Sequence, residues 1–338
     1  MKKTDLYQLK REFLEYCELE KGQSLLTVNS YSRYLDRFLS FLSDREAERQ
    51  RGREKKGDPS LRHSVTPSLV SSDITQDVVR QYRLYVNRLH DKNGSELKKT
   101  TQNYHILTLR SFLRYLAWRG IASLAPEKVP VAKADDRKIN FLEAAEVKNI
   151  LDLPSTGADS ESRDRAILEL FFSTGLRVSE LAALNVDEIN FERGEIAILG
   201  KGKKIRLVFL SADSVDLLSQ YLIERGIDPG STSKPKDEPL FLSNRDSRLT
   251  VRSIERLVKK YARRAGITKN VSPHTLRHSF ATDLLMAGAD IRSVQSMLGH
   301  SSISTTQIYT HVTDQHLRDT HQKFHGKSLE DQEQDKKL

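Results

Sequence analysis

The chain has 338 residues and a formal net charge of +9, from 55 Lys+Arg against 46 Asp+Glu. A chain of this length is expected to form two domains with cores of their own, and its single cysteine, Cys17, excludes an intrachain disulfide. It contains no run of about 18 apolar residues, so we expect a cytoplasmic protein without a membrane span; its positive charge favours a polyanionic partner such as nucleic acid.

Apolar residues recur at three- and four-residue spacing in four segments before residue 120, which predicts four helices. These segments are 4–20, 24–42, 75–90 and 99–119. Between the second and the third, residues 44–72 are charged and then rich in Ser and Pro, with almost no apolar residues. We therefore expect a helical domain over residues 1–120 that carries a mobile insertion at 44–72.

Residues 121–140 combine prolines with mixed charge and no sustained period, which is typical of an interdomain linker. The following domain, at 141–326, shows several helical segments and one alternating segment on either side of the turn GKGKK, which predicts a β-hairpin with a basic tip. The expected fold is mainly α with a small β-sheet, in two domains. The last residues, 327–338, have nothing to pack and are expected to be disordered.

Candidate residues for phosphodiester chemistry stand in this second domain. Attack on a phosphodiester without a metal needs cations on the non-bridging oxygens, a nucleophile, and a proton donor for the leaving oxygen. Arginine suits the first role because its planar fork binds phosphate and keeps its charge, and Lys201 at the hairpin tip suits the last. The candidate set is Arg177, Lys201, His274, Arg277, His300 and Tyr309. Each of these alone would more often be an ordinary surface or core residue.

His274 and Arg277 are three residues apart at the start of a predicted helix, so they share a face. His278 projects elsewhere, and we expect it to be structural. A metal site formed by these two histidines and His300 is the alternative, but no carboxylate or cysteine completes a ligand set. We expect neither a metal nor a cofactor.

Basic residues are also concentrated in TVRSIERLVKKYARRAG, where an apolar stripe leaves the cations on other faces. Such a face could bind the DNA backbone, and a solvated helix surface is the alternative. The candidate DNA-binding residues are Lys203, Lys204, Arg252, Arg256, Lys259 and Lys260.

The segments TGLRVSEL, GKGKKIRLVFL, HTLRHSFATDLL, LGHSSISTTQIYTHV and HLRDTHQKFH resemble the tyrosine site-specific recombinases, in particular the Xer type. The resemblance covers about 141–326, and five segments fall in family order. It implies an α+β catalytic domain preceded by a helical, SAM-like core-binding domain that contacts DNA. It also places the six candidate residues at the six active-site positions and Glu180 at an acidic position that supports Arg177.

The resemblance implies that Tyr309 attacks a DNA phosphate to give a 3′-phosphotyrosyl bond, with His274 assisting, Lys201 protonating the leaving oxygen and His300 bonding the phosphate. It further implies exchange between paired double-stranded sites through a Holliday junction by a homo- or hetero-tetramer whose C-terminal helices are exchanged, with an accessory DNA translocase as a further partner. We expect resolution of chromosome dimers. The alternatives are an integrase of a phage or transposon, a non-catalytic DNA-binding factor, and a relaxing topoisomerase.

Overall fold

The computed structural model describes residues 5–54, 69–91, 94–133, 141–153, 159–200, 205–231 and 234–299, with only the backbone for 50–54 and 159–160. The chain divides into two compact units, residues 1–137 and 138–338. Each unit is considered by itself. Within the described ranges, no helix is both long enough and apolar enough to cross a bilayer.

The first unit is built from four helices: α1 (Leu6–Leu19), α2 (Leu25–Glu54), α3 (Gln76–Asn87) and α4 (Lys99–Trp118). Single 3-10 turns lie at Ser71–Asp73 and Pro126–Lys128. The rings of Phe13 and Phe112 meet edge to face in the core, with their centroids 5.5 Å apart. The apolar period therefore predicted the helical class of this unit correctly.

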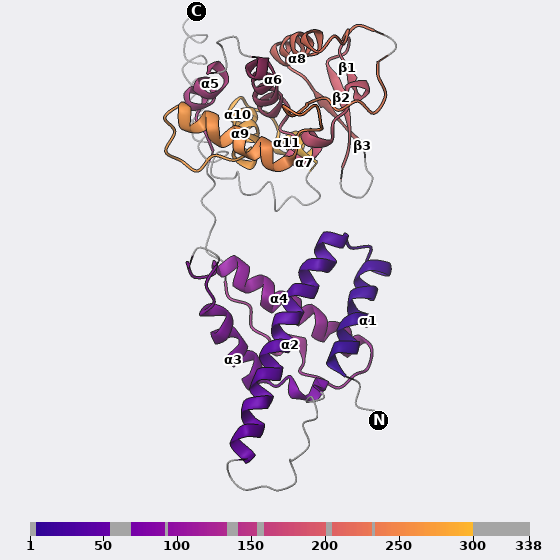
Figure 1. Cartoon of the computed structure of the whole chain (residues 1–338), viewed down its shortest axis with the longest axis vertical. Coiled ribbons are helices and arrows are strands. Elements are labelled where there is room, and N and C mark those ends of the chain that lie inside the picture. The colour runs from indigo at the N-terminus through magenta and orange to yellow at the C-terminus, as the bar shows by residue number, and fades with distance from the viewer. Residues whose placement is uncertain are drawn as a thin grey trace, which may run out of the picture. The chain divides into compact units, whose positions relative to one another are not determined.

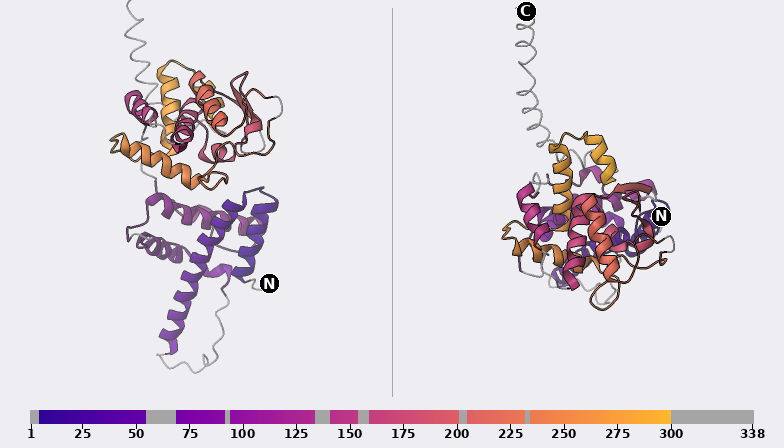
Figure 2. Two further views of the ribbon diagram at one scale, coloured as in Figure 1. Left: turned by 45° about the horizontal axis from the view of Figure 1, so that its top comes forward. Right: turned by 90° about the horizontal axis from the view of Figure 1, so that it is seen from above.

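Helix α2 extends beyond the point where its apolar period stops. Residues 44–54 continue the helix, although the sequence predicted that an irregular insertion begins at Asp44. Arg45 bonds Asp77 of α3 at 3.2 Å, and the segment is rich in Glu and Arg, which favour helix without any burial. The last turns of α2 run past the other helices of the unit (Figure 1, Figure 2).

The far end of the expected insertion is also ordered. Leu69 is 2% exposed, and Val70 pairs with Asp5 in an antiparallel bridge. Residues 55–68 lie outside the described residues, so the expectation of mobility is not tested there. In the expected linker, Val129 is 1% exposed and packs on the first core, which places residues 121–133 with the first unit.

A buried polar group joins three helices of the first unit. Arg37 of α2 donates to His105 Nε2 at 3.2 Å, and His105 Nδ1 lies 3.1 Å from the Tyr82 hydroxyl. Because a guanidinium can only donate, Nε2 must accept, so the ring proton sits on Nδ1 and is donated to Tyr82. The imidazole is 2% exposed and neutral. Burial first, and the charge of Arg37 second, lowers the pKa of His105 to about 4.

The second unit contains seven helices within the described ranges: α5 (Ala144–Asp152), α6 (Asp159–Thr174), α7 (Val178–Ala183), α8 (Ala212–Glu224), α9 (Val251–Arg264), α10 (Pro273–Met286) and α11 (Ile291–Leu298). Helix α6 packs against both α8 and α10. Ile167, Leu168, Leu170 and Phe171 are each 0% exposed, so α6 is buried on most of its circumference and forms the centre of this core.

A three-stranded antiparallel sheet lies at one side of this unit, in the order β1 (Ile189–Asn190), β2 (Glu195–Leu199) and β3 (Ile205–Phe209) (Figure 1). Ile196 pairs with Val208 and Ile198 with Arg206, as expected for the predicted hairpin. The face of β3 differs from its apolar pattern: Ile205 and Leu207 are 71% and 50% exposed, while Arg206 and Val208 point inward. The register with β2 decides this, because a pleated strand turns alternate residues to opposite faces.

We expect the stability of the first unit to depend on pH through His105. The unfolded chain takes up a proton near pH 6.5 and the folded unit only near pH 4, so acid favours unfolding. The free energy of unfolding should fall by about 2 kcal/mol between pH 7 and pH 5 from this group alone. Urea titrations followed by the fluorescence of Trp118, the one tryptophan, measure it.

His105→Gln should remove this part of the pH dependence, whereas His90→Gln, at an exposed position, should keep it. An unchanged slope in His105→Gln would show that the buried imidazole is not the responsible group.

Candidate active site

Two helix ends meet at the candidate site, and each ends in a glycine with left-handed backbone. Gly175 follows α6 with φ 58°, and Gly299 follows α11 with φ 62°. A Cβ atom at Gly175 would lie 2.4 Å from Cδ1 of Phe280, so this position excludes larger residues on steric grounds as well. Helix C-termini present unpaired carbonyl oxygens and a partial negative charge, which attract cations.

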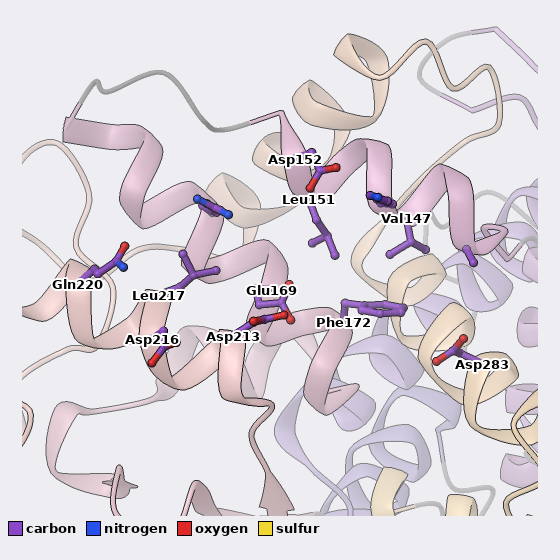
Figure 3. Close-up of a pocket in the computed structure, with 13 residues that line it drawn as sticks. Val147, Leu151, Asp152, Glu169, Phe172, Asp213, Asp216, Leu217, Gln220 and Asp283 are labelled. Atoms are coloured by element: carbon purple, nitrogen blue, oxygen red, sulfur yellow. The ribbon is translucent and has the colours of Figure 1, made fainter.

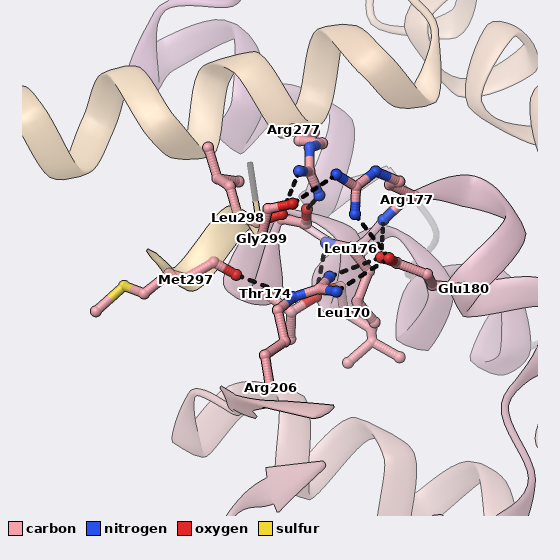
Figure 4. Close-up of polar contacts among 11 residues, drawn as sticks. Leu170, Thr174, Leu176, Arg177, Glu180, Arg206, Arg277, Met297, Leu298 and Gly299 are labelled. Atoms are coloured by element: carbon pink, nitrogen blue, oxygen red, sulfur yellow. Dashed lines mark hydrogen bonds and ion pairs between the residues drawn. The ribbon is translucent and has the colours of Figure 1, made fainter. Parts of the chain in front are cut away.

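The candidate arginines, Arg177 and Arg277, donate hydrogen bonds to these carbonyl oxygens (Figure 4). Arg277, which is 4% exposed on α10, donates from Nη1 to the carbonyl of Gly175 and from Nη2 to that of Leu298, both at 2.5 Å. Arg177 Nη2 donates to the carbonyl of Gly299 at 3.0 Å. The structure therefore brings Arg177 and Arg277 together on the end of α11, although 100 residues separate them in sequence.

Glu180 lies one turn into α7 and fixes the orientation of Arg177. Its carboxylate accepts the Arg177 backbone N–H and the Arg177 Nη1 group, both at 2.8 Å. The carboxylate thus caps the first turn of the helix and holds the side chain of the residue that precedes it. The sequence motif LRVSE produces this arrangement because it places the acidic residue three positions after the arginine.

Arg206 is a further member of this cluster that the sequence analysis did not select. It donates from Nη1 and Nη2 to the two oxygens of Glu180, at 3.0 and 2.7 Å. Burial alone would raise the pKa of Glu180, but the hydrogen bonds from Arg206 and Arg177 outweigh it and lower this pKa to about 2. No signal in the sequence marked it, because the apolar alternation of Ile205, Leu207 and Phe209 placed Arg206 on the outward face of the strand.

The remaining candidates divide into one described residue and several that are not described. His274 is exposed at the second position of α10, directly after Pro273. Ser272 caps this helix, because its side chain accepts from the Thr275 N–H. His274 makes no hydrogen bond to another described residue, so the structure does not join it to the arginine cluster. Outside the described residues lie Lys201, Lys203, Lys204, His300 and Tyr309.

Helix α9 carries the predicted basic surface. Arg252, Arg256 and Lys259 are exposed, opposite the buried side chains of Ile254 and Val258. Lys260 is also half-exposed, but its ammonium lies 3.6 Å from the buried carboxylate of Asp164. A pocket of about 780 Å³ at this helix is lined by cations and by hydroxyls, including Arg163, Arg245, Arg248, Ser247 and Ser253.

A second pocket of about 580 Å³, between α5, α6, α8 and α10, has the opposite charge (Figure 3). Carboxylates surround its apolar floor: Asp152, Glu169, Asp213, Asp216 and Asp283. Burial raises the pKa of Glu169 despite its bond from Ser211. Like charge would repel a phosphate here, so this pocket is no candidate for phosphodiester chemistry. Among the described residues, no group of His, Cys, Asp and Glu is arranged to hold a metal ion.

Comparison with known proteins finds a family model and relatives matched over most of the chain. A model of the phage integrase family matches residues 140–316. Tyrosine recombinase XerC of Thermodesulfovibrio yellowstonii is 36% identical over 95% of this chain and 97% of its own. Tyrosine recombinase XerD of Staphylococcus saprophyticus is 36% identical over 94% and 98%. The XerH site-specific recombinase in its complex with difH substrate superimposes with a TM-score of 0.63, at 25% identity, over 92% of this chain and 83% of that one.

We expect Glu180→Gln to destabilise the second unit by about 3 kcal/mol, because it leaves the Arg177 and Arg206 guanidiniums without the carboxylate that both require. Urea unfolding followed by circular dichroism measures the change. Glu192→Gln, the same substitution at an exposed position, should stay within about 0.5 kcal/mol of the parent. Equal stability of the two variants would mean that the cluster does not depend on the charge of Glu180.

Proposed function

Because this chain belongs to the phage integrase family and is a tyrosine recombinase that breaks and rejoins DNA strands, we propose that it exchanges strands between specific sites through a covalent 3′-phosphotyrosyl intermediate. The relatives are matched over almost their full length, so the proposal concerns the whole protein. Double-stranded DNA is the substrate, as in the recombinase complex with difH.

The observation that carries this proposal is the preorganised pair Arg177 and Arg277. Both guanidiniums are held on backbone carbonyls, and Arg177 also on Glu180. Arg177 has five N–H donors, and its bonds to described residues use two of them. We assign the other three to phosphate oxygens. Fixed cations stabilise the negative charge that builds up on a phosphate during attack, without reorganising at that moment.

The remaining roles are those that the resemblance to the tyrosine recombinases implies. The Tyr309 oxygen attacks the phosphorus, the bond to the 5′ oxygen breaks, and that oxygen takes a proton from Lys201. His274 assists removal of the tyrosine proton, and His300 bonds a phosphate oxygen. The phosphotyrosyl bond conserves the energy of the phosphodiester, so a 5′ hydroxyl of the partner strand can reverse the step without ATP or a metal.

The DNA contact is assigned to two basic regions. Exposed side chains on α9 are those of Arg252, Arg256 and Lys259, while Lys260 forms an ion pair with Asp164. Lys203 and Lys204 stand between β2 and β3 in the sequence. Contacts of this kind with the phosphate backbone position a protein on DNA but carry no sequence information directly, so the target site is read elsewhere on the protein.

For the biological role, we favour resolution of chromosome dimers through a Holliday junction. The full-length similarity to two Xer recombinases supports this role over that of a phage or transposon integrase. The enzyme would act as a homo- or hetero-tetramer on paired sites, with C-terminal helices exchanged between protomers and a DNA translocase as activator. Recombination between two copies of one site on a circular plasmid, with no integration into a plasmid that lacks the site, would distinguish the two roles.

The nucleophile is tested by Tyr309→Phe. We expect complete loss of the covalent protein–DNA band on a nicked suicide substrate, with half-site binding retained, because the variant lacks only the attacking oxygen. The parent should form the band in excess EDTA, since arginines supply the positive charge. Tyr7→Phe, at a half-exposed tyrosine of α1, should behave as the parent. A band from Tyr309→Phe would assign the attack to another residue.

The general acid is tested by Lys201→Ala. On an ordinary substrate, we expect cleavage to slow by about 100-fold or more, the usual worth of positioned proton transfer. On a substrate with a 5′-bridging sulfur, the loss should be less than about tenfold, because a thiolate leaves without a proton. Lys236→Ala, at an exposed loop position, is the control and should lose nothing. The same loss on both substrates would remove Lys201 from the role.

A further inference from the structure

Arg206 is placed where three parts of the candidate site come together. Its Nε donates to the carbonyl of Met297 at 3.2 Å, while its two terminal nitrogens bind Glu180. Its side chain is 12% exposed, and that of Glu180 is 11% exposed. One guanidinium therefore connects β3, the first turn of α7 and the end of α11 (Figure 4).

The end of α11 is held by three arginines from three different elements. The carbonyl of Met297 accepts from Arg206, that of Leu298 from Arg277, and that of Gly299 from Arg177. Consecutive carbonyls of a helix end are thus each bound by a separate cation, an arrangement that the helix dipole favours. These bonds define the backbone position of Gly299, the last described residue.

Gly299 also makes room for Arg206. A Cβ atom there would lie 3.0 Å from Cδ and 3.2 Å from Nε of Arg206, closer than side chains normally approach. The arginine side chain therefore lies directly against the glycine backbone. A side chain at position 299 would therefore crowd Arg206.

Arg206 binds both oxygens of Glu180, whereas the side chain of Arg177 binds one of them. Burial raises the pKa of this carboxyl, and the hydrogen bonds from both arginines outweigh that effect and keep it ionised. Without Arg206, the carboxylate would lose two of the bonds that fix its position, and the Nη1 group of Arg177 would lose a fixed partner. The orientation of Arg177 thus depends on a residue that need not contact DNA.

We propose that Arg206 is a positioning residue for strand cleavage: through Glu180 it orients Arg177 toward the scissile phosphate, and through Met297 it fixes the end of α11. This inference rests on the proposed function. A displacement of about 1 Å in a catalytic group can cost about 100-fold in rate, so the loss of Arg206 should affect cleavage far more than DNA binding.

The test is single-turnover cleavage of a suicide substrate by Arg206→Gln, Arg206→Lys and the parent, with half-site binding measured in parallel. For Arg206→Gln we expect cleavage to fall by about 100-fold and half-site affinity to change by less than about threefold. Arg206→Lys keeps the charge but not the bidentate fork, so a loss of about tenfold is expected. Arg193→Gln alters an exposed arginine that precedes β2 in the same sheet, and it should cleave as the parent.

A substrate with a neutral methylphosphonate in place of the scissile phosphate tests whether Arg206 acts through Arg177. Arg177 acts on the phosphate charge, so the deficit of Arg206→Gln relative to the parent should shrink to below about tenfold on this substrate. A deficit of the same size as on phosphate, parent-like cleavage, or equal losses of binding and cleavage would overturn the proposal.

Two further outcomes are separable. If Arg206→Gln does not fold, Arg206→Lys must show the same pattern at its smaller size, and its failure to do so would equally overturn the inference. If the parent forms no covalent complex, the proposed function fails; if the parent forms it and both variants match the parent, only the role of Arg206 fails.

Discussion

The second unit depends on one electrostatic constraint: arginine side chains bind the carbonyl ends of α6 and α11. Arg277 spans the two ends, and Arg177 and Arg206 complete the end of α11. Guanidiniums can do this because they are planar, always charged and rich in donors. The same bonds that satisfy these helix ends also fix the cations in place, so local stability and readiness for phosphate have a common physical origin.

Glu180 is hydrogen-bonded to both Arg177 and Arg206, and it accepts four hydrogen bonds from them. A buried carboxylate is costly on its own, but with two guanidiniums it stays ionised and holds both. The cluster keeps an excess of positive charge, which a phosphodiester can balance. The acidic pocket between α5, α6, α8 and α10 lies on other faces of α6 and α10, and its charge would turn such a ligand away.

Polar burial in the first unit serves a different purpose. His105 is neutral, bonded on both nitrogens and packed edge to face against the ring of Tyr34, with the centroids 4.4 Å apart. It ties α2, α3 and α4 together within a core of aromatic side chains. A buried imidazole that satisfies both of its polar atoms fixes the relative placement of helices, at the cost of stability in acid.

The sequence by itself determined the helical class, the hairpin and the residue types of the site, because apolar periods and motif spacing act over a few residues. The Arg177–Glu180 pair could be recognised from the sequence for the same reason: three residues separate them on one helical turn. It missed the helical residues 44–54, since an exposed helix needs no apolar period. It also missed Arg206, whose inward orientation follows from the pairing of β3 with β2 and whose partners are 26 and 91 residues away. Only the tertiary structure decided that three arginines share one helix end, because hydrogen bonds between distant elements depend on how the chain packs and leave no periodic trace in the sequence.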